Sequence, residues 1–221
     1  DGTLYDDRQY VRAGLLNAAA TLEDETGRDL SADLLEAYFR EGIRDRTFDI
    51  VLARNGLSRD YVPQLVNAYH AHDEPLVPFP DTVSVLADLA QVHEIGLLTG
   101  GTKGQEKLRR LGITSHFDSV CVTAGTDTSK READPFLDVL SDLGVQPSDS
   151  VYVGDRPRLD FVQPNRIGMG TVRILNGQYA TRSADGEAEP TAVVDTLRDL
   201  GFEILLALLT LVSSDRLYLL F

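Results

Sequence analysis

Acidic and hydroxyl side chains follow several short apolar segments of the sequence. Asp1 and Thr3 lie in "DGT", Thr99 precedes two glycines in "LLTGG", and Asp155 and Asp160 lie in "VYVGDRPRLD". Carboxylate oxygens at such positions suit a hard cation such as Mg²⁺. A hydroxyl beside glycine amides suits an anionic oxygen, because glycine lets the backbone approach closely. Together these residue types predict a site for Mg²⁺ and phosphate.

One lysine joins this set. The chain has three lysines, Lys103, Lys107 and Lys130, against 18 arginines. Lys130 lies in the polar stretch "TSKREADPF", and a compact ammonium there would stabilise charge that develops on a phosphoryl group. Each motif also has an ordinary structural interpretation: helix capping for the acidic pair, a plain turn for Thr-Gly-Gly, and an exposed loop lysine. Their order after successive apolar segments favours the functional interpretation.

Apolar segments of strand character alternate with amphipathic segments in the second part of the chain. The strand-like segments are 94–99, 119–123, 150–154, 170–175 and 191–195. Helices are expected between them near 81–92, 104–111, 134–143 and 159–167. This alternation predicts an α/β fold with a doubly wound, Rossmann-like parallel sheet. Ligands bind such sheets at the carboxyl ends of the strands, which is where the polar residues above fall.

Composition narrows the classes of partner. The formal net charge of −14 argues against nucleic acid, which requires a basic surface. The 24 aspartates and 11 glutamates fit either an ordinary solvated surface or the halophilic proteins of a salt-rich cytoplasm. Cys121 is the single cysteine, so no disulfide forms within the chain, which fits a reducing cytoplasm. The apolar stretch "GFEILLALLTLV" is shorter than the ~20 residues that span a bilayer, so we expect no membrane anchor.

The motifs, in this order, resemble those of the haloacid dehalogenase superfamily. Phosphatases of that superfamily carry a first strand ending in Asp-x-Asp-Gly-Thr, a second ending in Thr or Ser, a loop lysine, and Gly-Asp-x-x-x-x-Asp. Here "DGTLYDD" matches the second half of the first motif, Thr99 the second motif, Lys130 the third, and "GDRPRLD" the fourth. The match covers roughly residues 1–200, and four motifs in the right order are more specific than any one alone.

The resemblance implies a domain organisation. Residues 1–9 and 79–200 would form the Rossmann-like catalytic core. The helical pattern over 10–78 would be a cap domain inserted after the first motif, and 201–221 would be an apolar C-terminal tail. Tyr5 and Arg12 could face the site from the first linker and the first cap helix.

The resemblance also implies a Mg²⁺-dependent phosphatase that acts on a small phosphorylated metabolite, as a monomer or homodimer. An aspartate would attack phosphorus to form an aspartyl-phosphate, and Asp1 would act as the acid and base. Asp160 would either reach the metal through water or orient Lys130. The implied catalytic residues are Asp1, Thr99 and Lys130, the phosphate-binding residues Thr3, Thr99, Gly100 and Lys130, and the metal ligands Asp1, Asp155 and Asp160.

The nucleophile of the superfamily lies two residues before the acid/base aspartate, and therefore ahead of Asp1. We therefore expect the sequence to be a fragment or to have a misassigned start. Two alternatives stay open. A carbon–halogen hydrolase is one, although "DGT" counts against it, because that branch needs neither a second aspartate nor a metal. A protein that binds a phosphate ligand or a partner without turnover is the other.

A missing first strand would leave a slot in the middle of the sheet, between the strands that lead to Thr99 and to Asp155. The chain carries a short apolar run, "RLYLLF", of the kind that normally precedes the first aspartate. One hypothesis is that 217–221 fills the slot, in its own chain or in a neighbour's, with Phe221 near Asp1. The interpretation we prefer from sequence is a terminal helix or a disordered tail.

Overall fold

The computed structural model describes residues 1–200 and 218–221, and the chain divides into two units. The sheet unit comprises Asp1–Asp6 and Leu76–Phe221, and the helical unit comprises Asp7–Pro75. The helical unit thus begins and ends slightly earlier than the 10–78 expected from sequence. Tyr5 forms an antiparallel bridge with Pro78, so both linkers belong to the sheet unit.

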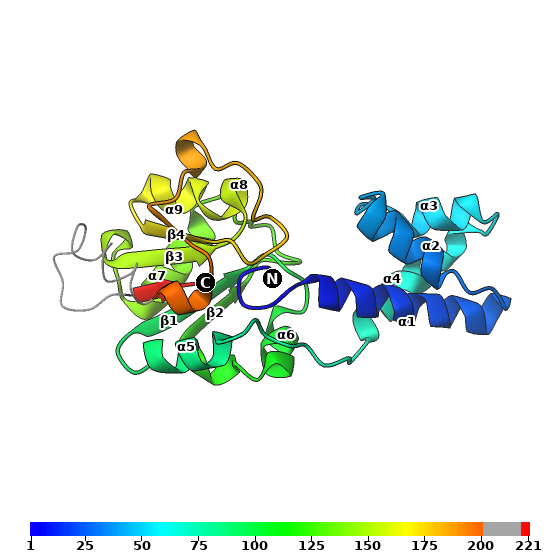
Figure 1. The fold of residues 1–221 in the computed structure, drawn as a ribbon, viewed down its shortest axis with the longest axis horizontal. Helices are drawn as coiled ribbons and strands as arrows, with labels where there is room; N and C mark the ends of the chain where they lie inside the picture. The colour runs from blue at the N-terminus through cyan, green and yellow to red at the C-terminus, as the bar shows by residue number, and fades with distance from the viewer. Residues whose placement is uncertain (201–217) are drawn as a thin grey trace. The chain divides into compact units, whose positions relative to one another are not determined.

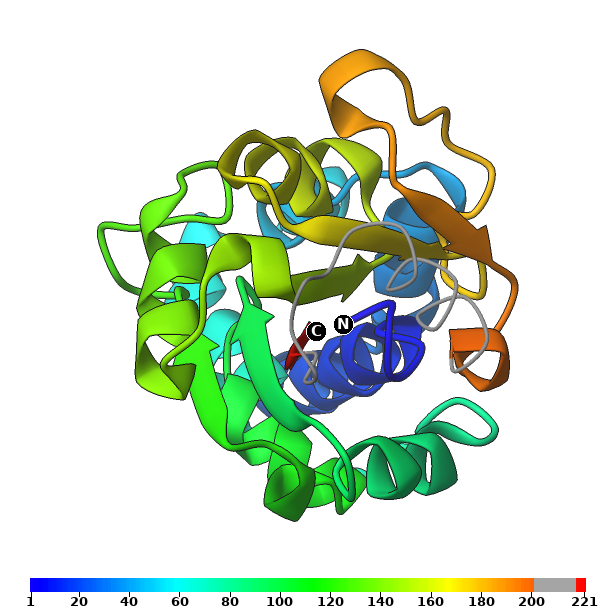
Figure 2. The ribbon, with the colours of Figure 1, turned by 90° about the vertical axis from the view of Figure 1, so that its left-hand side faces the viewer.

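A six-stranded parallel sheet forms the centre of the sheet unit in the described residues (Figures 1 and 2). Its strand order is β2-β1-β6-β3-β4-β5. The strands are β1 (Glu94–Thr99), β2 (Ser119–Val122), β3 (Ser150–Gly154), β4 (Gly170–Ile174), β5 (Ala192–Val194) and β6 (Tyr218–Leu220). The first five correspond to the five predicted strands, and the predicted α/β fold with a parallel Rossmann-like sheet is confirmed.

Helices flank this sheet. They are α5 (Thr82–Leu89), α6 (Gly104–Leu111), α7 (Asp134–Leu143), α8 (Pro157–Asp160) and α9 (Val162–Ile167). Helix α7 packs on β1 and β2, and its Phe136 and Val139 are fully buried against Leu98, Tyr152 and Leu220 of three different strands. Burial of this apolar face is what holds the helix on the sheet.

Strand β6 occupies the centre of the sheet, between β1 and β3 (Figures 1 and 2). It pairs with both neighbours in parallel: Leu219 is level with Ile95 on β1 and with Val151 on β3. The hypothesis that 217–221 fills the slot is therefore confirmed for Tyr218–Leu220, with the strand supplied by the same chain. The preferred interpretation, a terminal helix or a disordered tail, is wrong for 218–221, while 201–217 lies outside the described residues.

Residues 218–220 form a strand because the backbone groups of β1 and β3 that face each other need hydrogen-bond partners. Two facing strands without a partner leave buried N–H and C=O groups unpaired, and each such group costs ~1–3 kcal/mol. An apolar strand satisfies both ladders at once and buries its side chains on both faces of the sheet. Leu219 and Leu220 are 0 % exposed, as expected for the central strand of a parallel sheet.

The helical unit has its own apolar core. Its helices are α1 (Arg8–Thr26), α2 (Ser31–Leu35), α3 (Thr47–Arg54) and α4 (Val62–Ala71), with a π-helical turn over Glu36–Arg40. Gly14 lets α1 approach α4 closely, because a Cβ there would lie 2.6 Å from the ring of Tyr69. Among the described residues, no helix is long and apolar enough to cross a membrane.

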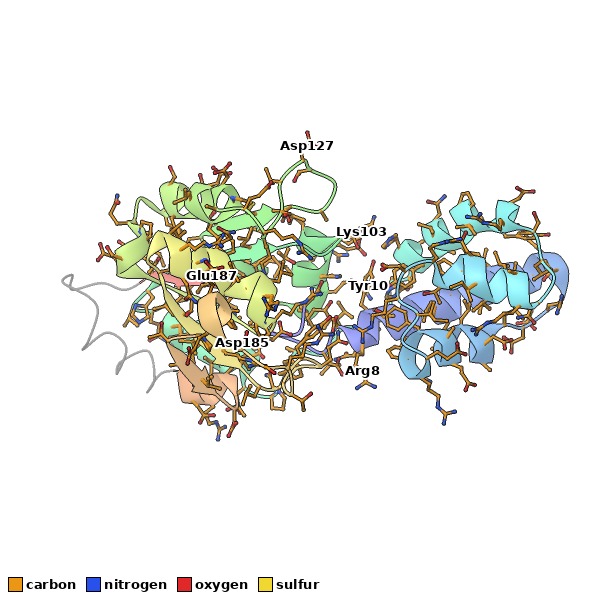
Figure 3. All side chains as sticks on the ribbon, turned by 90° about the horizontal axis from the view of Figure 1, so that it is seen from above. Arg8, Tyr10, Lys103, Asp127, Asp185 and Glu187 are labelled. Atoms are coloured by element: carbon orange, nitrogen blue, oxygen red, sulfur yellow. The ribbon has the colours of Figure 1, made fainter. Side chains whose placement is uncertain are left out.

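Ion pairs lie on the exposed loop between β4 and β5. Arg166 pairs with Glu187 at 2.8 Å and Arg158 with Asp185 at 3.4 Å, and Figure 3 labels both acidic residues. Exposed pairs of this kind contribute ~0–1 kcal/mol each, so the loop is held mainly by other contacts. One is the Arg173 guanidinium, which donates to the backbone carbonyl of Tyr179 at 2.9 Å.

Truncating the central strand should destabilise the whole sheet unit. We expect Leu219→Ala and Leu220→Ala each to lower the free energy of unfolding by about 2–5 kcal/mol, because each leaves a cavity in a fully buried site. Val193→Ala, on the edge strand β5 and 50 % exposed, serves as the control, with a loss below about 1 kcal/mol. Urea denaturation measures all three. Equal, small losses would contradict the central position of β6.

Candidate active site

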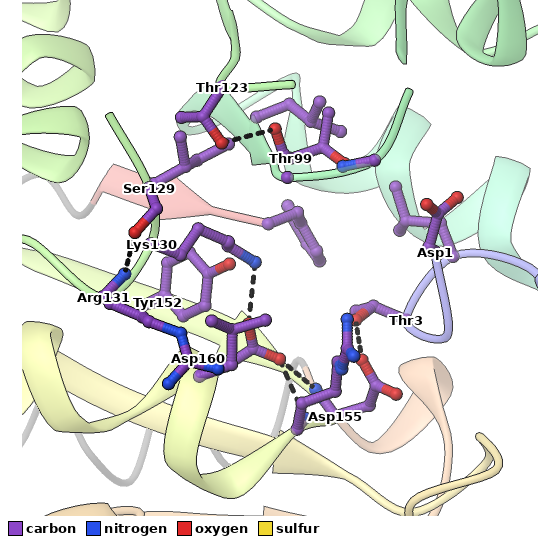
Figure 4. A pocket seen from close by; sticks show the side chains of 18 of the residues that line it. Asp1, Thr3, Thr99, Thr123, Ser129, Lys130, Arg131, Tyr152, Asp155 and Asp160 are labelled. Atoms are coloured by element: carbon purple, nitrogen blue, oxygen red, sulfur yellow. Dashed lines mark hydrogen bonds and ion pairs between the residues drawn. The ribbon is translucent and has the colours of Figure 1, made fainter. Parts of the chain in front are cut away.

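The structure brings all the predicted site residues to one open pocket of about 370 Å³ (Figure 4). Thr99 ends β1 and Asp155 directly follows β3, so the pocket lies at the carboxyl ends of the central strands. The predicted residues that line it are Asp1, Thr3, Thr99, Gly100, Lys130, Asp155 and Asp160. Tyr152, Arg131 and Arg156 also line it and were not expected there, whereas Phe221 lines it as the slot hypothesis expected.

Asp155 is a buried carboxylate with one satisfied oxygen. Its Oδ1 accepts a hydrogen bond from the Thr3 hydroxyl at 3.2 Å, whereas its Oδ2 is buried and has no hydrogen-bond partner among the described residues. Burial, and then the negative charge of Asp160, raise the pKa of Asp155 to about 6. A buried acceptor with no partner is costly, so this oxygen is the place in the pocket where a cation or a donor would be most stabilising.

The "DGT" turn packs directly against this carboxylate. Gly2 has a φ of 80°, and a Cβ there would lie 2.2 Å from Asp155 Oδ2. Gly177, from the loop after β4, closes the other side, since its Cβ would lie 2.7 Å from the Gly2 carbonyl oxygen. Both positions therefore require glycine, and backbone packs closely against the Oδ2 side of the Asp155 carboxylate.

Lys130 and Asp160 form a buried ion pair. The ammonium lies 2.7 Å from Asp160 Oδ1, and Asp160 Oδ2 accepts from the backbone N–H groups of Asp155 (3.1 Å) and Arg156 (2.8 Å). Burial alone would lower the pKa of Lys130, but Asp160 and then Tyr152 outweigh it and the pKa is raised. Burial alone would likewise raise the pKa of Asp160, but Lys130 holds it below its usual value. Both groups are therefore charged at neutral pH.

The Thr-Gly-Gly turn follows β1. The Gly101 N–H donates to the Thr99 hydroxyl at 3.1 Å, and the Thr123 N–H donates to the Thr99 carbonyl at 2.9 Å. A Cβ at Gly100 would lie 4.0 Å from the Lys130 side chain, so the turn and the lysine border the same space. The turn thus combines a hydroxyl, backbone amides and a nearby ammonium, the groups that bind phosphoryl oxygens.

Asp1 is held by residues from two other segments. Lys107 on α6 places its ammonium 3.0 Å from each carboxylate oxygen, and the Tyr5 hydroxyl donates to Oδ1. A Cβ at Gly101 would lie 2.1 Å from Asp1 Oδ2, so a side chain there would displace the Asp1 carboxylate. Tyr5, one of two residues expected from sequence to face the site, is therefore in contact with it. Arg12, the other, lies on α1 of the helical unit.

Lys107 and Tyr152 were missed by sequence reasoning. Lys107 had a usable signal, because it is one of only three lysines in an arginine-rich chain, and two of those three are buried and paired with aspartates that line the pocket. Tyr152 lies two residues before Gly154, on the same face of β3, with the Lys130 ammonium 5.1 Å from its ring centroid. Alternation along the predicted strand would have placed it beside the site.

The chain is similar to known hydrolases over most of its length. Residues 1–174 match the family model described as haloacid dehalogenase-like hydrolase. A protein named glyceraldehyde 3-phosphate phosphatase from Methanopyrus kandleri is 33% identical, over 91% of this chain and 95% of its own. A protein of the same name from Methanocaldococcus jannaschii is 30% identical, over 90% and 92%.

Among solved structures, a HAD phosphatase from Thermococcus onnurineus superposes with a TM-score of 0.63 at 25% identity. The match covers 92% of this chain and 94% of that one. A predicted phosphoglycolate phosphatase from Haemophilus somnus superposes with a TM-score of 0.68 at 20% identity, which shows a shared fold.

The raised pKa of Asp155 predicts a pH dependence of stability without added metal. Between the usual pKa of an aspartate, ~4, and about 6, the unfolded chain is ionised while the folded protein keeps the proton, so stability falls as pH rises. Asp155→Asn removes this effect. Urea denaturation in EDTA measures the free energy of unfolding of the variant and of the unmodified chain. We expect the difference, variant minus unmodified chain, to increase by about 2–3 kcal/mol from pH 4 to pH 7. A difference that does not change with pH would contradict the shift.

Proposed function

Because the chain belongs to the haloacid dehalogenase-like hydrolases, we propose that it is a Mg²⁺-dependent phosphatase of a small phosphate monoester. The observation that carries the proposal is the pocket, in which a buried carboxylate with one unpartnered oxygen faces the same space as a buried lysine and a Thr-Gly-Gly turn. These are the groups that phosphoryl transfer requires, since it depends on positioning and on stabilisation of charge.

Asp155 fits a magnesium ion. Its Oδ2 is buried without a hydrogen-bond partner among the described residues, and a hard cation is a natural ligand for such an oxygen. Asp160 is the less direct ligand, because Lys130 and two backbone N–H groups already occupy its oxygens. The described residues contain no group of three or more acidic, histidine or cysteine ligands, so Asp155 would hold the ion together with the backbone carbonyl of Asp1 and with oxygens of water or substrate. When bound, Mg²⁺ supplies charge stabilisation at the phosphoryl oxygens.

The other residues have separate roles in this proposal. Thr99 and the Gly100 N–H bind phosphoryl oxygens, and Lys130 offsets the negative charge of the phosphoryl group. Thr3 orients Asp155 through its hydrogen bond. Asp1 gives a proton to the leaving oxygen and later takes one from water, and Tyr5 and Lys107 hold it in place for both steps.

The attacking group is an aspartate two residues before the acid/base aspartate, by resemblance to the family. The carboxylates that line the pocket within the described residues are Asp1, Asp155 and Asp160. Asp160 is paired with Lys130, Asp1 is paired with Lys107, and Asp155 is the proposed metal ligand, which leaves none of the three as an obvious nucleophile. This observation supports a second candidate function, in which the protein binds a phosphate ligand without hydrolysing it.

The substrate we propose first is glyceraldehyde 3-phosphate. Two relatives that the chain matches over 90% or more of its length carry that activity in their names, and both are at least 30% identical. A three-carbon phosphate is also consistent with a pocket of about 370 Å³. We further propose a cytoplasmic protein that acts as a monomer or homodimer.

The proposal is tested by an assay of glyceraldehyde 3-phosphate hydrolysis in which the released inorganic phosphate is measured. We expect turnover that requires Mg²⁺ and that Asp155→Asn lowers at least about 100-fold, because the metal loses its buried ligand. Asp185→Asn, on an exposed loop, is the matched control and should keep full activity. Mg²⁺-dependent turnover that survives Asp155→Asn would contradict the metal site. Phosphate binding by isothermal titration without turnover would favour the second function.

A further inference from the structure

Arg173 is a buried arginine near the end of β4, and only 5 % of it is exposed. One of its nitrogens, Nη2, donates to the backbone carbonyls of Tyr179 (2.9 Å), Ala180 (3.3 Å) and Arg182 (2.7 Å). Its Nε is buried and has no hydrogen-bond partner in the described part of the chain. Carbonyl oxygens offset the lost hydration of a guanidinium less well than a carboxylate does. Arg173 therefore holds the loop after β4 at some cost to stability.

The part of the loop that Arg173 holds, residues 176–182, is called the anchored segment below. It packs against the end of the pocket where Asp155 lies. A Cβ on Gly177 would lie 2.7 Å from the Gly2 carbonyl oxygen and 3.1 Å from Asp155 Oδ2. The loop backbone therefore packs against both the "DGT" turn and the unpartnered oxygen of Asp155. Because no side chain makes these contacts, the place of the backbone depends on what holds the segment elsewhere.

A second contact joins the anchored segment to the pocket. The Tyr179 side chain is buried, and the guanidinium carbons of Arg156 and Arg182 each lie 4.7 Å from its ring centroid. Arg156 directly follows Asp155 and lines the pocket. A cation–π contact of this kind contributes ~0.5–1 kcal/mol at an exposed site, which is enough to orient a side chain. The segment thus meets the residues at the end of β3 through both Gly177 and Tyr179.

We propose that Arg173 is a positioning residue for the metal end of the pocket. By binding three carbonyls it keeps Gly177 and Tyr179 in place, and these in turn fix the oxygens that would hold Mg²⁺. The inference rests on the proposed function, in which Asp155 and the backbone carbonyl of Asp1 are those oxygens. Residues that orient metal ligands without binding the metal typically change its affinity by about 10–100-fold when they are replaced. Arg173 acts through the loop and touches neither metal nor substrate.

The charge of Arg173 and its positioning role have opposite effects on cation binding. Burial lowers the pKa of Arg173, and the negative charge of Asp155 opposes this shift, so the two side chains interact electrostatically. If Arg173 acted on the pocket through its charge alone, removal of that charge would tighten the binding of a cation. If it acts by positioning, the same change weakens cation binding, because the anchored segment is released. The direction of the change in Mg²⁺ affinity therefore separates the two.

The experiment titrates the full chain with Mg²⁺, above the pKa of Asp155 and without substrate, and follows the NMR signal of the Gly2 amide. Arg173→Met removes the donors, whereas Arg173→Lys supplies an ammonium with three donors for the three carbonyls. We expect the Mg²⁺ dissociation constant to rise at least about tenfold in the first variant and to stay within about threefold in the second. Arg166→Met is the matched control, because Arg166 holds the same loop at Glu187, outside the anchored segment, and its loss should leave the constant unchanged.

A readout without metal tests the position of the segment itself. In EDTA, the Gly177 α-protons should show nuclear Overhauser contacts to protons of Gly2 and Thr3 in the unmodified chain and in Arg173→Lys, and these contacts should be absent in Arg173→Met. Should Arg173→Met fail to fold, Gly177→Ala takes its place. The new Cβ would collide with the Gly2 carbonyl and displace the segment with its anchor intact, so Mg²⁺ binding should again weaken at least about tenfold.

The two readouts separate the inference from the proposed function. Lost contacts together with weaker Mg²⁺ binding, in Arg173→Met and not in Arg173→Lys, support the inference. Contacts that persist in Arg173→Met, Mg²⁺ binding that is unchanged or tighter in it, or an equal loss in Arg173→Lys would overturn the inference. If the unmodified chain shows the contacts but no saturable Mg²⁺ binding, the metal site of the proposed function is contradicted, and the contacts alone decide whether Arg173 positions the segment.

Discussion

The central slot of the parallel sheet is the constraint on which this protein depends. Strands β1 and β3 carry the polar ends that form the pocket, yet they are not neighbours; each presents a complete ladder of N–H and C=O groups to the space between them. An interior slot of this kind must be filled, because several buried unpaired backbone groups together would cost as much free energy as the whole net stability of a small domain. β6 fills it with a short apolar run, and thereby fixes the separation between Thr99 on one side and Asp155 on the other.

Once that separation is fixed, electrostatics organises the pocket. Lys130 and Asp160 stabilise each other in a buried site, and the remaining oxygen of Asp160 binds the backbone N–H groups that follow β3. This arrangement leaves Asp155 as the carboxylate that burial makes hardest to ionise. In the proposed function a divalent cation would relieve that cost, so metal binding and the stability of the fold are expected to be coupled at this residue. Glycines at positions 2, 101 and 177 allow backbone and carboxylates to approach so closely.

Much of this could be predicted from local pattern. Apolar runs bounded by polar residues predicted β1 and β3 with their observed bounds. Helical periodicity and capping signals predicted the bounds of α6 and α7 equally well. The pocket residues were found because the ends of parallel strands meet at one edge of the sheet. The failures were contacts between distant segments. A run of five apolar residues does not distinguish a strand from a helix. The position of β6 is set instead by the two strands, β1 and β3, that would otherwise lack a pairing strand between them. Lys107 was missed because its contact with Asp1 is set by where α6 packs.

The central claim is that 218–221 forms an interior strand, and the exchange of the Leu98 amide hydrogen tests it most directly. In the structure this N–H is bonded to the Phe221 carbonyl rather than to any residue of 1–200. Measured by NMR, its exchange should require global unfolding, with an opening free energy equal to that of the most protected amides in β1 and β3. Exchange as fast as that of an exposed loop amide, such as Asp127, in an otherwise folded protein would show that the slot is not filled by β6.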